Sequence, residues 1–175
     1  MKKSYIEVIS KYLGVTPIEI NSDLVSAQNR KRLYWTNIDN VTIPDDKHIE
    51  IKDILEDIEI EGTVGPFKNS VRQNVLNQYD KIINSTKKIQ RLDCFSGWQD
   101  NKVGITKTPT LRAGNSFCLI KTPTNQIRLI TVTEAERLQT LPDGYTAGVS
   151  DSNRFKALGN CWTVDVVAHI FKGLK

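Results

Sequence analysis

The sequence predicts an α/β fold, because a helical pattern is followed at once by a strand pattern and a second strand pattern lies close behind it. The apolar residues between Tyr5 and Leu13 recur at near-helical spacing, and Gly14 follows as a C-cap, which indicates a short amphipathic helix. Residues 17–21 alternate like a strand, and residues 32–38 are rich in aromatic and β-favouring residues. This order is typical of the edge of an α/β sheet.

The middle of the chain, from about residue 40 to residue 127, has short elements joined by polar connections, which predicts a small inserted domain. The apolar residues at 51–55 indicate one or two helical turns, and those at 71–83 indicate a further helix. Residues 96–98 and 107–111 are typical of turns and short strands.

Strong helical patterns return after residue 128. Thr133-Glu134-Ala135-Glu136 fits a capping box in which Thr133 is the N-cap and Glu136 reaches back to it. The turn residues 142–144 are expected to end that helix.

Two more helices are predicted at the end of the chain. Asp151 or Ser152 can cap a shorter helix that runs to Leu158, where Gly159 is expected to break it. Residues 163–174 have the pattern of a final amphipathic helix.

The composition is that of one ordinary domain, since 175 residues with 39% hydrophobic content can bury a core. The net charge of +4 is unevenly spread. Residues 43–62 hold eight acidic and two basic side chains, a balance of −6, whereas residues 63–128 hold eleven basic and three acidic ones, a balance of +8. The middle of the chain is therefore either a footprint for a polyanion or a solvated basic surface.

Several classes of protein are disfavoured. The apolar runs are too short to span a bilayer, and the N-terminus lacks the apolar stretch of a secretion signal, so we expect a cytoplasmic protein with no membrane partner. The three cysteines form no close pair and the chain has two histidines, so neither a disulfide framework nor a metal site is indicated.

The densest polar cluster, residues 25–32, stands directly before the aromatic strand. In an extended backbone, Gln28, Arg30 and Arg32 would project to one face. Two guanidiniums and an amide on one face can hold phosphate and a base carbonyl, because arginine offers a planar fork of charged donors. A solvated edge strand is the alternative interpretation.

The same residues, Gln28-Asn29-Arg30-Lys31-Arg32 (the base-side block), resemble the Gln-x-Arg-x-Arg block of DNA cytosine-5 methyltransferases. In that family the block lies beside the catalytic pocket. The resemblance implies that Arg32 contacts the flipped target cytosine, and that Arg30 and Gln28 support the catalytic loop and a nearby phosphate.

A second stretch, residues 128–145 (the middle block), resembles the family's Arg-x-Leu-Thr, Glu-x-x-Arg-Leu-Gln and Phe-Pro-x-x-Tyr succession, with Ile130 for the usual Leu and Leu141 for the usual Phe. A third, residues 154–164 (the closing block), is similar to the family's closing Gly-Asn-Ser-Val motif, with Cys161 in place of Ser. The resemblance implies that Asn160, Cys161 and Trp162 line the pocket for S-adenosylmethionine.

All three blocks occur in the family's order, which implies a partial S-adenosylmethionine-dependent methyltransferase (Rossmann-like) domain with a small, irregular α+β target-recognition insert. Residues 1–39 would belong to the catalytic sheet, residues 40–127 to the target-recognition domain and residues 128–175 to the closing helices. Residues 107–111 resemble a Ser/Thr-Pro-Thr-Leu segment of such recognition regions. The candidates for contacts with double-stranded DNA are Gln99, Lys102, Lys107, Thr110, Arg112 and Asn115.

The family's catalytic motifs are missing. No cysteine follows a proline to serve as the nucleophile, and neither Glu-Asn-Val nor the Phe-x-Gly-x-Gly cofactor loop occurs. The chain is therefore not expected to methylate DNA alone. We expect an N-terminal methyltransferase half on another polypeptide to share the cofactor, since Met1 falls about where the Glu-Asn-Val block would have ended. A non-catalytic DNA-binding or accessory relative and a decayed gene fragment are the alternatives.

Overall fold

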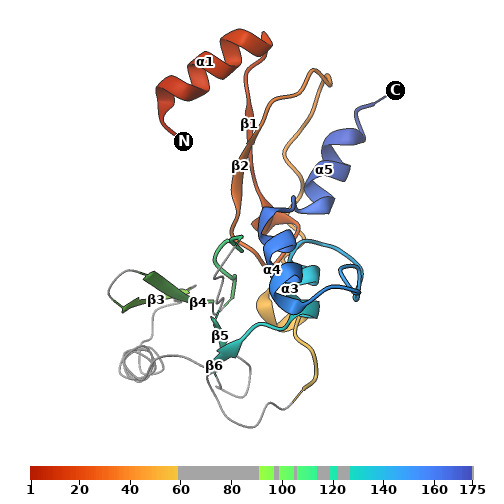
Figure 1. Ribbon diagram of the computed structural model, residues 1–175. Coiled ribbons are helices and arrows are strands. Elements are labelled where there is room, and N and C mark those ends of the chain that lie inside the picture. Colours follow the sequence, from red (N-terminus) through yellow and green to blue (C-terminus); the bar gives the residue numbers. More distant parts are fainter. Residues whose placement is uncertain (59–90, 97–98, 105, 114–118, 122–126, 175) are drawn as a thin grey trace.

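The computed structural model describes residues 1–58, 91–96, 99–104, 106–113, 119–121 and 127–174, and Figure 1 shows their arrangement. Two small sheets are present in these ranges. In the first, β1 (Ile18–Asn21) pairs antiparallel with β2 (Lys31–Tyr34). The second has the strand order β3-β4-β5-β6, with β4 and β5 parallel and the other pairs antiparallel. Its strands are β3 (Arg91–Ser96), β4 (Gln99–Gly104), β5 (Leu119–Lys121) and β6 (Ile127–Leu129).

The helices lie around the β1–β2 pair and below it in Figure 1. The first, α1 (Lys3–Leu13), ends at Gly14 in the left-handed conformation, so the predicted helix and its glycine C-cap are confirmed. After the second sheet come α3 (Val132–Leu138), α4 (Asp151–Asn160) and α5 (Val164–Phe171). Two 3₁₀ turns complete the described elements, η1 (Ser22–Leu24) and η2 (Ile51–Asp53). In the described ranges no helix is both long enough and apolar enough to cross a bilayer.

Two hydrophobic clusters form the core. The larger one joins η2, α3 and α4, and its buried members are Ala27, Ile51, Ile54, Leu111, Ile130, Val132, Ala135, Leu138 and Leu158. The smaller one joins β1 to α5 through Ile20, Val25, Val166 and Ile170. Val25 and Ala27 belong to different clusters, so the residues leading into β2 run from one core to the other. The segment that carries the base-side block is therefore fixed from both sides.

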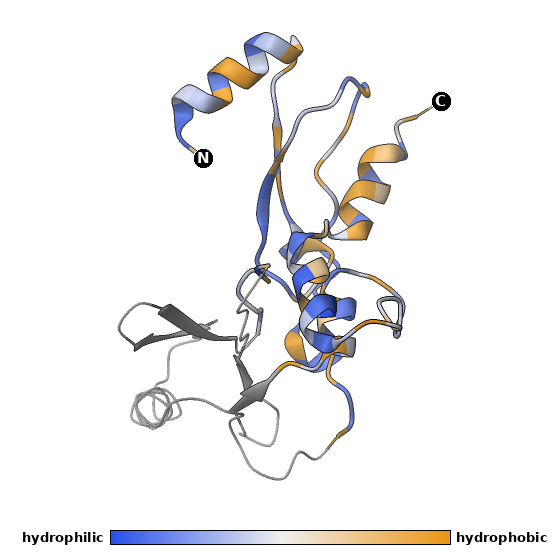
Figure 2. Ribbon diagram, in the orientation of Figure 1, coloured by the Kyte–Doolittle hydropathy of each residue, from blue (hydrophilic) through white to orange (hydrophobic). Residues whose placement is uncertain are grey.

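The helix α1 has no buried residue. Several of its apolar side chains are well exposed, with Tyr5 57%, Val8 51% and Tyr12 86% accessible. A hydrogen bond from the Trp35 indole to the Ser10 hydroxyl, 3.0 Å long, ties the helix to the segment after β2. Figure 2 shows apolar positions along both α1 and α5. An amphipathic helix with an exposed apolar face is typical of a surface that another chain covers.

The capping box of α3 begins two residues earlier than predicted. Thr131, not Thr133, is the N-cap: its hydroxyl accepts the Glu134 amide at 3.1 Å, and the Glu134 carboxylate accepts the Thr131 amide at 2.9 Å. Both Thr131-x-x-Glu134 and Thr133-x-x-Glu136 satisfy the motif. The earlier frame is adopted because it leaves the Glu136 carboxylate free for the loop that follows the helix.

The helix ends also differ from prediction. The helix α3 stops at Leu138, before the expected turn at residues 142–144, because Thr140 takes a positive φ of 56°. Gly159 does not break α4, which continues to Asn160, and the N-cap is Ser150. The final helix is confirmed in place but shorter, and the predicted strand at residues 32–38 is confirmed over its first half. The predicted helix at residues 71–83 lies outside the described residues.

The two ends of the middle of the chain are joined by a carboxylate clasp, formed by Glu56, Thr131 and Glu134. The Glu56 amide donates to the Glu134 carboxylate at 3.0 Å, and the Thr131 hydroxyl donates to the Glu56 carboxylate at 2.5 Å. The Arg137 guanidinium adds bonds to the carbonyls of Ile54 and Leu55 at 3.0 and 3.2 Å. The clasp therefore holds the segment after η2 against the start of α3.

Candidate functional site

Gln28 is fully buried, and its carboxamide joins two distant segments. Its Nε2 lies 3.3 Å from both the Leu138 carbonyl and the Gln139 Oε1, and its Oε1 accepts the Leu111 amide at 2.9 Å. The backbone supports this placement, because Gln28 forms a parallel β-bridge with Thr108. Gln28 therefore connects the base-side block to α3 and to the residues around position 110.

Arg30 is also buried, with 4% of its surface accessible. Its guanidinium donates to three backbone carbonyls, Leu111 at 2.9 Å, Gly159 at 3.2 Å and Cys161 at 2.7 Å. Two of these carbonyls lie at the C-terminal end of α4, where the helix dipole favours a cation. Burial lowers the pKa of Arg30 from its usual value, and the neighbouring Arg32 lowers it further. Arg30 thus holds the turn between α4 and α5.

Arg32 is exposed, and one of its N–H groups donates to the Lys31 carbonyl at 2.7 Å. Burial therefore changes along the expected face: Gln28 and Arg30 are buried, whereas Arg32 is exposed. The pairing partner of the backbone changes over the same residues. The backbone at Gln28 bridges to Thr108, whereas pairing with β1 begins at Lys31.

The turn of the closing block is anchored by its backbone. A Cβ on Gly159 would lie 2.2 Å from the Arg112 carbonyl carbon, so α4 touches the chain at residues 112–113 directly. On the other side of the turn, the buried Thr163 hydroxyl lies 2.8 Å from the Ser22 hydroxyl. Between these anchors Asn160 is exposed, Cys161 is half-buried and Trp162 is 65% exposed. The predicted cofactor residues are therefore held in place yet accessible.

A polar node lies between these segments, consisting of the buried residues Ser22, Ser26, Gln28, Arg30, Gln139 and Thr163. Ser26 donates to the Leu138 carbonyl at 2.6 Å, and Gln139 donates to the Leu158 carbonyl at 2.6 Å. The node brings together the base-side block, the middle block and the closing block. Gln139 was missed as a site residue, although it stands in the Glu-x-x-Arg-Leu-Gln motif, because a motif does not reveal which polar side chains are buried.

The loop after α3 is held by the fully buried carboxylate of Glu136. It accepts the amides of Gly144 and Thr146, each at 2.7 Å, the Thr146 hydroxyl, and the Arg154 guanidinium at 3.1 Å. Burial alone would raise the pKa of Glu136, but the hydrogen bonds from Thr146, Arg154 and Gly144 outweigh it and hold the pKa below its usual value. The middle block is thereby tied to α4.

A family model of the C-5 cytosine-specific DNA methylases matches residues 21–175, a range that includes all three blocks. This chain belongs to the C-5 cytosine-specific DNA methylase family.

Two solved structures resemble this chain in fold. The Entamoeba histolytica methyltransferase EhMeth is 15% identical, with a TM-score of 0.56 over 91% of this chain and 54% of that one. The S. pombe Dnmt2 methyltransferase is also 15% identical, with a TM-score of 0.54 over 98% of this chain and 61% of that one. The predicted methyltransferase-like α/β fold is confirmed in outline. The chain spans somewhat more than half the length of these two methyltransferases.

Lys107, one of the residues predicted to contact DNA, is bonded within the chain in this structure. Its Nζ donates to three backbone carbonyls, Asp23 at 2.6 Å, Ser26 at 3.1 Å and Ile49 at 2.6 Å. An ammonium has three N–H donors, so all of them are used within the chain. Burial lowers the pKa of Lys107, while nearby carboxylates such as Asp46 raise it. This placement argues against a phosphate contact. Lys107 instead connects the segments that contain its three acceptors.

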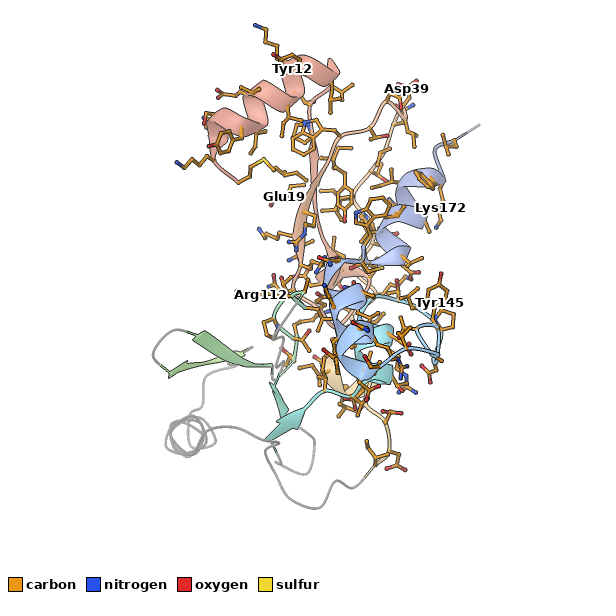
Figure 3. All side chains as sticks on the ribbon, in the orientation of Figure 1. Tyr12, Glu19, Asp39, Arg112, Tyr145 and Lys172 are labelled. Carbon is orange, nitrogen blue, oxygen red and sulfur yellow. The ribbon has the colours of Figure 1, made fainter. Side chains whose placement is uncertain are left out.

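The other residues predicted to contact DNA have different surroundings from Lys107. The Thr110 hydroxyl donates to the Asn29 carbonyl at 2.7 Å, so it supports the base-side block. Arg112 is exposed, and Figure 3 shows it near the start of β2, on the opposite side of the view from Tyr145. Gln99 and Lys102 lie on β4, but their side chains are outside the described part of the chain, as is Asn115. Among the described side chains, Arg32 and Arg112 remain accessible cations of the predicted set.

Proposed function

We propose that this chain is the C-terminal part of a DNA (cytosine-5) methyltransferase. Completed by an N-terminal half on another polypeptide, it methylates cytosine C5 in double-stranded DNA with S-adenosylmethionine. One observation carries the proposal: Arg30, two residues before Arg32, donates to the carbonyls on both sides of Asn160. The residue expected to touch the base and the residue expected to touch the cofactor therefore belong to one rigid unit. In this proposal the catalytic part is residues 1–39, the recognition part is residues 40–127 and the closing part is residues 128–175.

On the base side, Arg32 is the residue proposed to contact the target cytosine after it leaves the helical stack. Its guanidinium is exposed and carries five N–H donors in a planar fork, which suits a base carbonyl. Gln28 and Arg30 are buried and act on the reaction through the positions of other residues. They are positioning residues in this proposal.

On the cofactor side, the residues of the closing turn fit S-adenosylmethionine. The exposed Asn160 offers an amide donor and acceptor, and the exposed Trp162 offers an aromatic face. A few polar groups beside an aromatic surface are typical of nucleotide-like ligand sites. When bound, the cofactor supplies the methyl group. Asn160, Cys161 and Trp162 would hold and orient it, while Thr163 and Arg30 keep the turn in place.

The proposed partner supplies the nucleophile, since no cysteine of this chain follows a proline. The exposed apolar residues of α1, together with Phe171 of α5 at 54% exposure, provide a surface that such a partner can bury. Burying apolar surface contributes roughly 25 cal/mol per Å², so covering these side chains would favour association. The two strands β1 and β2 also offer unpaired edges within the described residues.

The decisive experiment mixes this chain with an N-terminal half that carries the Phe-x-Gly-x-Gly, Pro-Cys and Glu-Asn-Val motifs. We expect transfer of a labelled methyl group from S-adenosylmethionine to DNA with the pair and with neither chain alone. Arg32→Ala should reduce kcat/KM by about 100-fold, as for loss of one charged transition-state contact. Lys31→Ala is the matched control, because Lys31 is an exposed neighbouring cation whose ammonium pairs with Glu19 at 3.3 Å. Undiminished activity of the N-terminal half by itself contradicts the proposal.

A second candidate function is that of a catalytically inactive DNA-binding or accessory relative of these methyltransferases. The absence of the Pro-Cys motif from this chain favours it. In that case the chain should bind DNA or assist a complete methyltransferase, and Arg32→Ala should leave that assistance unchanged. The same variant therefore separates the two functions.

A further inference from the structure

Gln139 belongs to the middle block and contacts the two other blocks, although nothing in the proposed reaction uses it. It is the C-cap of α3 and is fully buried. Its Nε2 donates to the Leu158 carbonyl in α4 at 2.6 Å. Its Oε1 lies 3.3 Å from the Gln28 Nε2 and 3.2 Å from the Thr163 hydroxyl. Its backbone carbonyl accepts the Val164 amide at 3.0 Å, so the start of α5 is tied to the same residue.

These contacts are part of a closed ring of hydrogen bonds. Gln139 connects to Thr163, whose hydroxyl lies 2.8 Å from that of Ser22. Ser22 in turn donates to the Arg30 carbonyl from its amide at 3.1 Å and its hydroxyl at 3.3 Å. Arg30 follows Gln28 by two residues, which returns the ring to Gln139. A closed ring restricts the movement of the base-side block relative to the closing turn more than separate bonds do.

The chemistry of the position requires a carboxamide. Its partners include a carbonyl, which needs a donor, and the Gln28 amide and Thr163 hydroxyl, which need an acceptor. An amide supplies both at once without a charge. A glutamate would place a carboxylate in a fully buried position, and a methionine of similar length would supply neither a good donor nor a good acceptor.

We propose that Gln139 is a positioning residue for methyl transfer, which fixes the distance between Arg32 on the base side and Asn160 on the cofactor side. This inference rests on the proposed function. Gln139 is buried, whereas Arg32 and Asn160 are exposed, so it acts through Gln28 and through the turn between α4 and α5. Reacting atoms tolerate little misplacement, since an error of about 1 Å can reduce the rate by about 100-fold.

The test compares Gln139→Met with Leu138→Val in the full chain. Leu138 is the buried neighbour, and shortening it weakens the core while every polar partner of Gln139 stays in place. With the N-terminal half added, Gln139→Met should lower kcat by about 100-fold. The KM values for DNA and S-adenosylmethionine should change by less than kcat. Leu138→Val should leave kcat within about threefold at a temperature where both variants are folded.

A second readout needs no activity. In hydrogen exchange of this chain by itself, Gln139→Met should speed exchange of the Leu111 and Val164 amides by about tenfold relative to Leu138→Val. The Leu111 amide bonds to the Gln28 carboxamide, which the Gln139 side chain holds, and Val164 follows Thr163, whose hydroxyl loses its contact with Gln139. If the wild-type pair transfers no methyl group, the proposed function fails, and unchanged exchange at these amides overturns the role of Gln139 independently.

Thr163→Val covers the case in which Gln139→Met does not fold. It keeps the shape of the side chain and removes the hydroxyl that lies between Gln139 and Ser22. We expect kcat to fall by about tenfold with little change in KM. Equal kcat losses in Leu138→Val and in the ring variants, Gln139→Met or Thr163→Val, would show that the ring contributes stability without positioning and would overturn the proposal.

Discussion

Replacing Gly159 by alanine separates two physical effects that act in opposite directions. Inside a helix, glycine to alanine usually stabilises a protein by roughly 0.5–1 kcal/mol. In α4, however, the new Cβ would meet the Arg112 carbonyl carbon at 2.2 Å, the Ala113 nitrogen at 2.3 Å and the Arg112 oxygen at 2.3 Å. All three atoms belong to the backbone, so no flexible side chain can move aside.

The size of the clash decides whether Gly159→Ala raises or lowers the free energy of unfolding. Carbon atoms in contact normally lie about 3.5–4.0 Å apart, so α4 and the Arg112 segment must separate by more than about 1 Å. Such overpacking costs about 1–3 kcal/mol. The separation also lengthens the hydrogen bonds from the Arg30 guanidinium to the Leu111 and Gly159 carbonyls. Each weakened hydrogen bond costs about 1 kcal/mol. We therefore expect Gly159→Ala to lower the free energy of unfolding by about 2 kcal/mol or more.

Urea unfolding of the full chain measures this change through the midpoint at constant slope. The control is Gly14→Ala, where φ is +69° and no atom lies within 4 Å, so strain of the backbone acts without a clash. The free energy of unfolding of Gly14→Ala should fall by about 1 kcal/mol. A midpoint for Gly159→Ala equal to or above that of the wild type would refute the reasoning, because helix propensity would then outweigh the contact.

Further predictions concern charge. The folded-state pKa of Glu136 lies below its usual 4.5, so its contribution to stability is present above pH 4.5 and is lost as the pH falls through the folded value. The melting temperature of the wild type should therefore drop more steeply than that of Glu136→Gln below about pH 4.5. Lys107→Met should lower the free energy of unfolding by about 2 kcal/mol or more, since each partly buried carbonyl left without a donor costs about 1 kcal/mol or more. An unchanged urea midpoint would show that the three Lys107 bonds do not contribute. DNA binding by the reconstituted pair should weaken with rising salt, and Arg112→Ala should reduce the slope of log K against log salt by about one, whereas Lys107→Met should leave the slope unchanged.

Local elements were predictable where neighbouring residues decide the structure. The helix ending at Gly14 and the strand at residues 18–21 depend on spacing and on one left-handed position, and both are confirmed. The start of α3 was not decidable in the same way, because Thr131 and Thr133 both begin a capping motif. Which of the two threonines caps the helix depends on the hydrogen bonds of Glu136. One of its partners, Arg154, lies eighteen residues further along the chain.

The sequence predicted which segments form the site better than it predicted what each residue does there. The three blocks identified the segments that meet, but the sequence did not show that Gln28 and Arg30 point inward while Arg32 stays exposed. For Lys107 the sequence suggested a DNA contact because a lysine in a basic stretch looks available. Its acceptors come from residues 23, 26 and 49, between 58 and 84 positions earlier. Such distant partners leave no periodic pattern in the sequence.

The carboxylate clasp at Glu56 and Thr131 has a consequence for how this chain tolerates change. Because the clasp sets the span between these points, a longer connection between them adds little strain, and each doubling of a flexible loop costs only about 0.6 kcal/mol in closure entropy. The segment at residues 106–113 is excluded from this tolerance, because it holds Gln28, Arg30 and Gly159. On either side of that segment, changes in chain length can accumulate while the ring around Gln139 keeps its geometry. Two separate stretches of the gene are therefore expected to vary most in length.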